Sequence, residues 1–77
     1  MRKIKPPKNY TPEQVKTIRE TTGLSQNLFA WAIGVPPKTL RNWEQGLSKP
    51  NVAASRILYA VEMDRDILKD YVSEVKT

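Results

Sequence analysis

The feature of this sequence that most restricts its fold is a series of closely spaced signals that start and stop helices. Thr11-Pro12-Glu13-Gln14 provides a threonine N-cap, a proline at the first helical position and a glutamine at the capping-box position. Gly23, Gly34 and Gly46 each follow a segment with apolar residues at helical spacing, at the place where helices end in the left-handed conformation. No segment has the alternating pattern of a β-strand. We therefore predict an all-α fold of four to five short helices.

Apolar side chains recur at helical spacing in each of five segments. The first three segments end at the glycines, the fourth begins at Asn51, and the fifth covers about residues 66–76. A chain of 77 residues provides one small core, so we expect a single compact bundle. The side chains of the first four helices that are predicted to face this core are Val15, Ile18, Thr22, Leu28, Phe29, Ala32, Ile33, Leu40, Trp43, Ala54, Ile57, Leu58 and Val61.

Two residue types are absent, and their absence excludes several kinds of function. The chain has no cysteine and no histidine, so it can form neither a disulfide, a zinc site with nitrogen or sulfur ligands, nor a Ser/His/Asp or Cys/His catalytic group. The acids near residue 66 are expected to stabilise a helix N-terminus rather than hold a metal ion. We predict no enzyme activity, no cofactor and no metal site.

Positive charge is concentrated at the start of the chain and around residues 35–50. Thirteen Lys and Arg against eight Asp and Glu leave a formal charge of +5, which favours an anionic partner. Residues 1–10 contain no acid and predict a flexible basic arm ahead of a domain at 11–77, although a solubilising terminus without a partner is the alternative. The basic residues of the arm are Arg2, Lys3, Lys5 and Lys8.

No apolar run approaches the roughly 20 residues that a membrane helix needs. The basic start is not followed by the apolar segment of a signal peptide. We therefore expect a protein of the reducing cytoplasm that does not insert into a membrane.

Only Gly34-Val35-Pro36 separates the second and third predicted helices. Such a short turn does not allow an antiparallel hairpin, so the two helices are expected to cross steeply. Ala30 and Gly34, four and eight residues after Gln26, provide the small side chain and the turn residue that this crossing needs. The pattern is typical of a helix-turn-helix at about residues 25–46, whose second helix enters the major groove of DNA.

Five short segments of the helix-turn-helix region together form a recognisable motif. They are Leu24-Ser25-Gln26, Phe29-Ala30, Gly34-Val35, the run from Thr39 to Gly46, and Lys49-Pro50. On these residues, over about 11–62, the chain resembles the lambda-repressor/Cro-like (XRE) helix-turn-helix regulators, and among them the HigA-type and MqsA-type antitoxins. The resemblance implies a lambda-repressor-like bundle, homodimers on palindromic double-stranded operators, repression of transcription and, for antitoxins, binding of a toxin encoded beside them.

The third predicted helix has a polar face opposite Leu40 and Trp43. Lys and Arg side chains bind guanine, and Asn pairs with adenine, so this face fits base recognition in a major groove. An ordinary solvated helix surface is the alternative, and Arg41 has a phosphate contact as a second alternative. The predicted base-reading residues are Pro37, Lys38, Arg41 and Asn42.

Pro36 and Pro37 depart from the family, which has serine or threonine capping this helix. The capping bond is therefore expected to be absent, and prolines remove two backbone donors that would otherwise face a phosphate. The alternative is that the prolines pre-set φ for the first helical turn and present a ring to a thymine methyl. The resemblance also implies an ion pair between Arg19 and Glu44 that joins the first helix to the reading helix, with simple surface exposure as the alternative.

Phosphate contacts are expected before and after the reading helix. The free N–H groups at the start of the second helix attract an anion, and the resemblance gives its glutamine a contact with the DNA backbone. The predicted phosphate-binding residues are Ser25, Gln26, Asn27, Thr39, Gln45, Ser48 and Lys49.

Two apolar features have more than one interpretation. Trp31 lies off the apolar stripe of its helix, which indicates contact with DNA, contact with a protein, or an exposed side chain without function. The fifth helix either pairs with a second copy or packs onto the first and fourth helices. Its apolar side chains are Ile67, Leu68, Tyr71, Val72 and Val75.

Taken together, these patterns predict a sequence-specific DNA-binding transcriptional regulator that acts as a repressor, with the antitoxin of a toxin-antitoxin operon as a narrower form of this function. The alternative is a protein-binding module, toxin-neutralising or adaptor, with little affinity for DNA.

Overall fold

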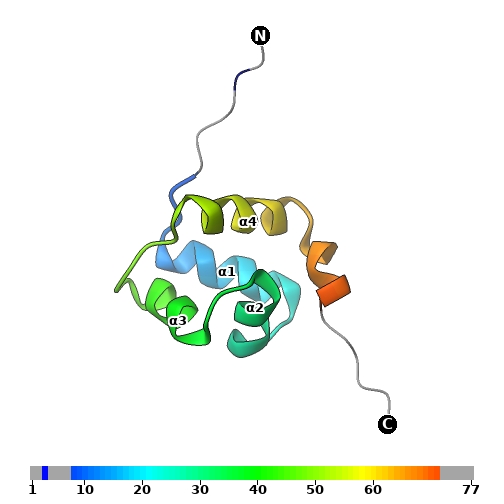
Figure 1. The fold of residues 1–77 in the computed structure, drawn as a ribbon, viewed down its shortest axis with the longest axis horizontal. Coiled ribbons are helices and arrows are strands. Elements are labelled where there is room, and N and C mark those ends of the chain that lie inside the picture. Colours follow the sequence, from blue (N-terminus) through cyan, green and yellow to red (C-terminus); the bar gives the residue numbers. More distant parts are fainter. Residues whose placement is uncertain (1–2, 4–7, 72–77) are drawn as a thin grey trace.

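The structure is a computed structural model that describes residue 3 and residues 8–71, and the statements below concern these residues. It contains α1 (Pro12–Thr22), α2 (Gln26–Ile33), α3 (Pro37–Gln45), α4 (Val52–Met63) and the 3-10 helix η1 (Arg65–Tyr71), and no strand within the described ranges. α1 lies between α4 and the α2–α3 pair, and η1 lies at the far end of the molecule from α3 (Figure 1). This architecture confirms the predicted all-α bundle.

Local capping bonds set the starts of three helices. The Thr11 Oγ1 accepts from the Gln14 backbone N–H at 3.2 Å, and the Gln14 Oε1 accepts from the Thr11 N–H at 2.9 Å, which completes the capping box of α1. The Ser25 Oγ caps α2 at the Leu28 N–H, and the Asn51 Oδ1 caps α4 at the Ala54 N–H. The first helix of the chain therefore begins where the sequence predicted.

The core contains side chains from all five helices and from the segment ahead of α1. Of the predicted set, Leu28 and Ile57 are exposed, and Thr22 and Ala32 are only half-buried. On α2 the buried face runs through Phe29, Ala30 and Ile33, so Leu28 points away from it. The buried hydrophobic residues are Tyr10, Val15, Ile18, Phe29, Ala30, Ile33, Leu40, Trp43, Ala54, Leu58, Val61 and Leu68.

The C-terminal segment differs from the predicted α-helix over residues 66–76. Asp64 ends α4 in an extended conformation, and its carbonyl and carboxylate accept from the N–H groups of Ile67 and Asp66, which starts a 3-10 helix at Arg65. η1 packs on α4, α1 and α2 and buries Leu68. Val72 and Val75 lie outside the described residues. None of the described helices is long and apolar enough to cross a membrane.

Candidate nucleic-acid interface

The third helix has one side fixed in the core and one side open to solvent. Leu40 and Trp43 are buried against the rest of the molecule, and α3 packs on both α1 and α2. On the other side Lys38 and Arg41 are exposed and Asn42 is half-buried. Within the described part of the chain, none of these three side chains has a hydrogen bond or an ion pair. We call Pro37, Lys38, Arg41 and Asn42 the reading face.

The turn between α2 and α3 has Gly34 in the left-handed conformation, as the sequence predicted. Gly34 has φ 83°, and the Val35 N–H donates to the Ala30 carbonyl at 2.9 Å. Apart from residue 34 itself and its two neighbours in the chain, a Cβ at Gly34 would meet no atom within 4 Å. The requirement for glycine therefore comes from the backbone conformation rather than from crowding. Ala30 is fully buried at the contact between the two helices.

The start of α2 leaves two backbone donors available. The Ser25 Oγ already accepts from Leu28, and the Phe29 N–H donates to the Ser25 carbonyl at 2.9 Å. The N–H groups of Gln26 and Asn27 have no acceptor among the described residues. This end of α2 therefore combines free donors with the positive end of the helix dipole, an arrangement that suits a phosphate.

The start of α3 is different. Pro36 is its N-cap residue and makes no side-chain capping bond, and Pro37 follows it. The N–H groups of Thr39 and Leu40 both donate to the Pro36 carbonyl, at 2.9 and 3.3 Å. Thr39, predicted to bind phosphate, is half-buried. The first turn of α3 thus keeps a single available backbone donor, that of Lys38, within the described chain.

The segment after α3 places exposed polar side chains near residues 9–12, just ahead of α1 and at its first residue. The Asn42 carbonyl accepts from the N–H groups of Leu47 and Ser48, at 2.9 and 3.4 Å, which folds the segment back on the end of the helix. Ser48 and Lys49 are exposed beyond it, and Gln45 is exposed in the last turn of α3. These three predicted phosphate contacts therefore lie at one end of the reading face.

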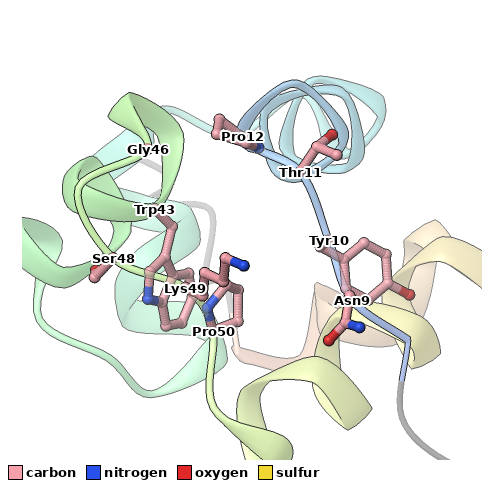
Figure 2. Close-up of a pocket in the computed structure, with 9 residues that line it drawn as sticks. All are labelled: Asn9, Tyr10, Thr11, Pro12, Trp43, Gly46, Ser48, Lys49 and Pro50. Carbon is pink, nitrogen blue, oxygen red and sulfur yellow. The ribbon is translucent and has the colours of Figure 1, made fainter.

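A pocket of about 230 Å³ separates this segment from residues 9–12 (Figure 2). Trp43 lies at one side of the pocket, with Lys49 and Pro50 next to it, while Asn9 and Tyr10 come from the other side (Figure 2). The chain ahead of α1 therefore approaches α3 next to Lys49.

Lys8 does not belong to a free arm, in contrast to the expectation for residues 1–10. Its Nζ forms an ion pair with the Glu62 Oε1 at 3.2 Å and lies 5.7 Å and 5.9 Å from the ring centroids of Tyr10 and Tyr59. The Tyr10 hydroxyl donates to the same Glu62 oxygen at 3.0 Å. Burial, followed by the bond to this carboxylate, raises the pKa of Tyr10 to about 12. Lys3 is exposed, and Arg2 and Lys5 lie outside the described residues.

An ion pair joins α1 to the reading helix. The Arg19 Nε and Nη2 donate to the two carboxylate oxygens of Glu44 at 2.9 and 3.0 Å, and the Arg19 Nη1 donates to the Leu24 carbonyl at 3.4 Å. The side chains of Arg19 and Glu44 are only 17% and 7% exposed. The bond to Glu44 raises the pKa of Arg19 despite the opposing effect of burial. Glu44 is the one acid in residues 36–50, so its pairing leaves the positive charge of Lys38, Arg41 and Lys49 uncompensated within that segment.

A second surface, which the sequence did not predict as a unit, is an apolar groove of about 540 Å³ between α2, α4 and η1. Trp31 and Tyr71 are 66% and 74% exposed there, and Ile57 and Ile67 are also exposed. The spacing of Ile57 on α4 predicted that it faces the core. It lines the groove instead, because η1 covers only part of that face of α4.

No group of three or more His, Cys, Asp or Glu within the described residues can hold a metal ion.

Comparisons with known proteins agree with this geometry. A helix-turn-helix family profile matches residues 15–58. Antitoxin HigA-2 of Vibrio cholerae serotype O1 is 37% identical over 60 residues, which cover 78% of this chain and 58% of that protein. The chain therefore spans little more than half the length of this curated relative. On both findings, the chain belongs to the helix-turn-helix family of the XRE type, as its sequence predicted.

Proposed function

We propose that this chain is a sequence-specific DNA-binding regulator of transcription in the cytoplasm, with α3 as the helix that enters the major groove. The observation that carries the proposal is the reading face, whose side chains have no partner in the described chain while Leu40 and Trp43 fix the other side of the same helix in the core. A helix held in this way presents its cationic and amide side chains to base edges in a fixed orientation.

Each group has a separate role in this proposal. Lys38 and Arg41 donate to guanine O6 and N7, and Asn42 pairs with adenine. The start of α2 and the segment after α3 bind backbone phosphates, which position the helix without reading sequence. Ahead of α1, the exposed Lys3 adds a phosphate contact, whereas Lys8 is paired with Glu62. The phosphate-binding residues are Ser25, Gln26 and Asn27 at the start of α2, and Gln45, Ser48 and Lys49 at the end of α3 and just after it. Thr39, half-buried in the first turn of α3, is not one of them.

Recognition of a palindromic operator needs two copies, because one reading helix contacts only a few base pairs. The apolar groove between α2, α4 and η1 is the surface that we assign to the second copy. It is lined by exposed Trp31 and Tyr71, and η1 has no extensive contact with α3, so pairing there leaves both reading faces free. Self-complementary aromatic contacts of this kind suit a two-fold interface.

A role as an antitoxin is the narrower form of the proposal, because the matched relative carries that name. In this form the operator-bound dimer represses its own operon and also binds the toxin encoded beside it. Co-expression of the adjacent small reading frame with this chain tests it: the two proteins co-purify and toxicity is suppressed. Persistent toxicity without co-purification would rule out the antitoxin role and retain the role of a regulator that acts without a toxin. A protein-binding module that has lost its affinity for DNA is the alternative.

Salt dependence of DNA binding separates the regulator from this alternative. Each cation that neutralises a phosphate contributes a log–log slope of about −0.9, so Lys49→Ala lowers the magnitude of the slope by about 0.9 for each bound copy. Lys69→Ala is the matched control, because Lys69 is exposed on η1, at the far end of the molecule from α3. Fluorescence anisotropy, with a duplex enriched from a random library, measures the salt slope of each variant. A flat salt response of the unchanged chain would contradict the proposal.

A further inference from the structure

The two prolines at the edge of the reading face distinguish this chain from a purely polar reader of DNA. Pro36 is exposed and Pro37 is half-buried, immediately ahead of Lys38. At the same edge the N–H groups of Thr39 and Leu40 are already bonded to the Pro36 carbonyl. Because proline has no N–H, this edge offers DNA two saturated rings and very few donors.

The contrast with α2 shows what this edge is unsuited to bind. Ser25 caps the start of α2 through its hydroxyl, and the N–H groups of Gln26 and Asn27 stay available. The start of α3 has no side-chain cap and one available donor, so it is a poor phosphate site. A phosphate bound there would give up hydrogen bonds to its hydration water without gaining a comparable number from the protein.

The major groove contains one apolar group, the C5-methyl of thymine. An apolar ring that faces the bases therefore has a single complementary partner, and burial of that methyl releases water from both surfaces. A polar base edge against the same ring would lose hydrogen bonds to water. The rings can thus select between base pairs without any hydrogen bond.

We propose that Pro36 and Pro37 form an apolar edge that recognises the methyl group of a thymine in each half-site. This inference rests on the proposed function and makes it more specific: the half-site contains a thymine adjacent to the bases read by Lys38. Pro36 and Pro37 are then specificity-determining residues, whereas Lys38, Arg41 and Asn42 recognise the neighbouring bases through hydrogen bonds.

Replacement of thymine by deoxyuridine removes the methyl group and leaves the hydrogen-bonding edge unchanged. A duplex is enriched by the full chain from a random library, and each thymine is then replaced in turn and tested by fluorescence anisotropy. We expect one position in each half-site at which deoxyuridine weakens binding about fourfold, the effect of about one buried methyl-sized group. The other positions should change by less than about twofold.

Variants of the two prolines assign the effect to the rings. Pro37→Ser and Pro36→Ser are each expected to remove most of the penalty, so that thymine and deoxyuridine duplexes bind them equally. Pro50→Ser is the matched control, because Pro50 lies after the reading helix and should retain the fourfold penalty. Circular dichroism and urea unfolding establish that each variant is folded, and serine at position 36 can form the capping bond that proline lacks.

The outcomes separate this inference from the function on which it rests. Enrichment of no duplex would overturn both. Enrichment of a duplex with no position sensitive to deoxyuridine, or with a sensitivity that both proline variants retain in full, would overturn the thymine assignment and leave the DNA-binding function in place.

Discussion

At the scale of the residue, the Arg19–Glu44 ion pair joins α1 to α3 beside the buried Leu40 and Trp43. Glu44 lies on α3 between Trp43 and the exposed Gln45, and its carboxylate would be buried without a partner if Arg19 were absent. Resemblance to a family predicted this pair. The bond from Lys8 to Glu62 was not predictable, because the two residues are 54 positions apart and the local sequence around Lys8 gives no information about its distant partner.

Arg19→Met tests the pair through stability. The substitution leaves the Glu44 carboxylate buried and unpaired, so we expect the free energy of unfolding to fall by about 3 kcal/mol in urea titrations at neutral pH. Arg41→Met is the matched control, because Arg41 is exposed and has no partner in the described chain. It should change stability by less than about 0.5 kcal/mol. Equal effects of the two variants would show that the ion pair contributes nothing specific.

Tyr10 gives a prediction for the dependence of stability on pH. Its pKa is about 12 in the folded chain against an ordinary 10.0, so the folded chain holds this proton more tightly than the unfolded chain. The resulting stabilisation is complete below about pH 10 and is lost as pH rises toward 12, by up to about 3 kcal/mol. The difference in unfolding free energy between the unchanged chain and Tyr10→Phe should therefore shrink above pH 10. A constant difference from pH 7 to 12 would contradict this assignment.

At the scale of the element, helix ends were predictable wherever a local signal sets them. The capping box at Thr11 and the caps at Ser25 and Asn51 act within four residues, so the sequence alone is sufficient. Tyr10 and Val15 occupy the two positions of a hydrophobic staple, a local signal for the burial of Tyr10 that the prediction of a flexible arm over residues 1–10 overlooked. η1 was mistaken for an α-helix because apolar spacing does not reveal that Asp64 accepts two bonds and tightens the chain.

Gly34→Ala tests the turn that joins α2 to α3. At φ 83° a Cβ meets the adjacent carbonyl, so alanine is expected to cost about 1–2 kcal/mol of stability even though the site is not crowded. Gly34→Asn should cost less, since asparagine tolerates the left-handed region better. Urea unfolding of the two variants measures the difference. Alanine without cost would mean that the turn adopts another backbone conformation.

At the scale of the whole molecule, two separate surfaces carry the two proposed contacts, the reading face for DNA and the apolar groove for a second copy. The reading face lies on α3, while the apolar groove lies between α2, α4 and η1. Of these three elements, η1 is at the end of the molecule away from α3 (Figure 1). Helix periodicity places Lys38 and Arg41 opposite Leu40, so the sequence predicted which side of α3 is open to solvent. Base recognition by that side stays a prediction. The groove depends on how η1 meets α4 and α2, a tertiary arrangement that no local pattern contains.

Ile67→Glu tests pairing through the groove. A charge on this exposed wall should abolish the dimer in sedimentation velocity experiments and weaken binding to a palindromic duplex by at least about tenfold, while helix content and unfolding stay unchanged. Met63→Glu is the matched control, because Met63 is exposed on α4 but does not line the groove. A dimer that persists in Ile67→Glu would place the interface elsewhere.

The most direct test of the central claim compares Asn42→Ala with Lys49→Ala on the enriched duplex and on single-base variants of it, by fluorescence anisotropy at one salt concentration. If α3 reads bases, Asn42→Ala loses about 1–3 kcal/mol of discrimination at one base pair, whereas Lys49→Ala weakens all duplexes to a similar extent and keeps the order of preference. Equal losses on every duplex for both variants would contradict the account, because α3 would then contribute charge and no sequence recognition.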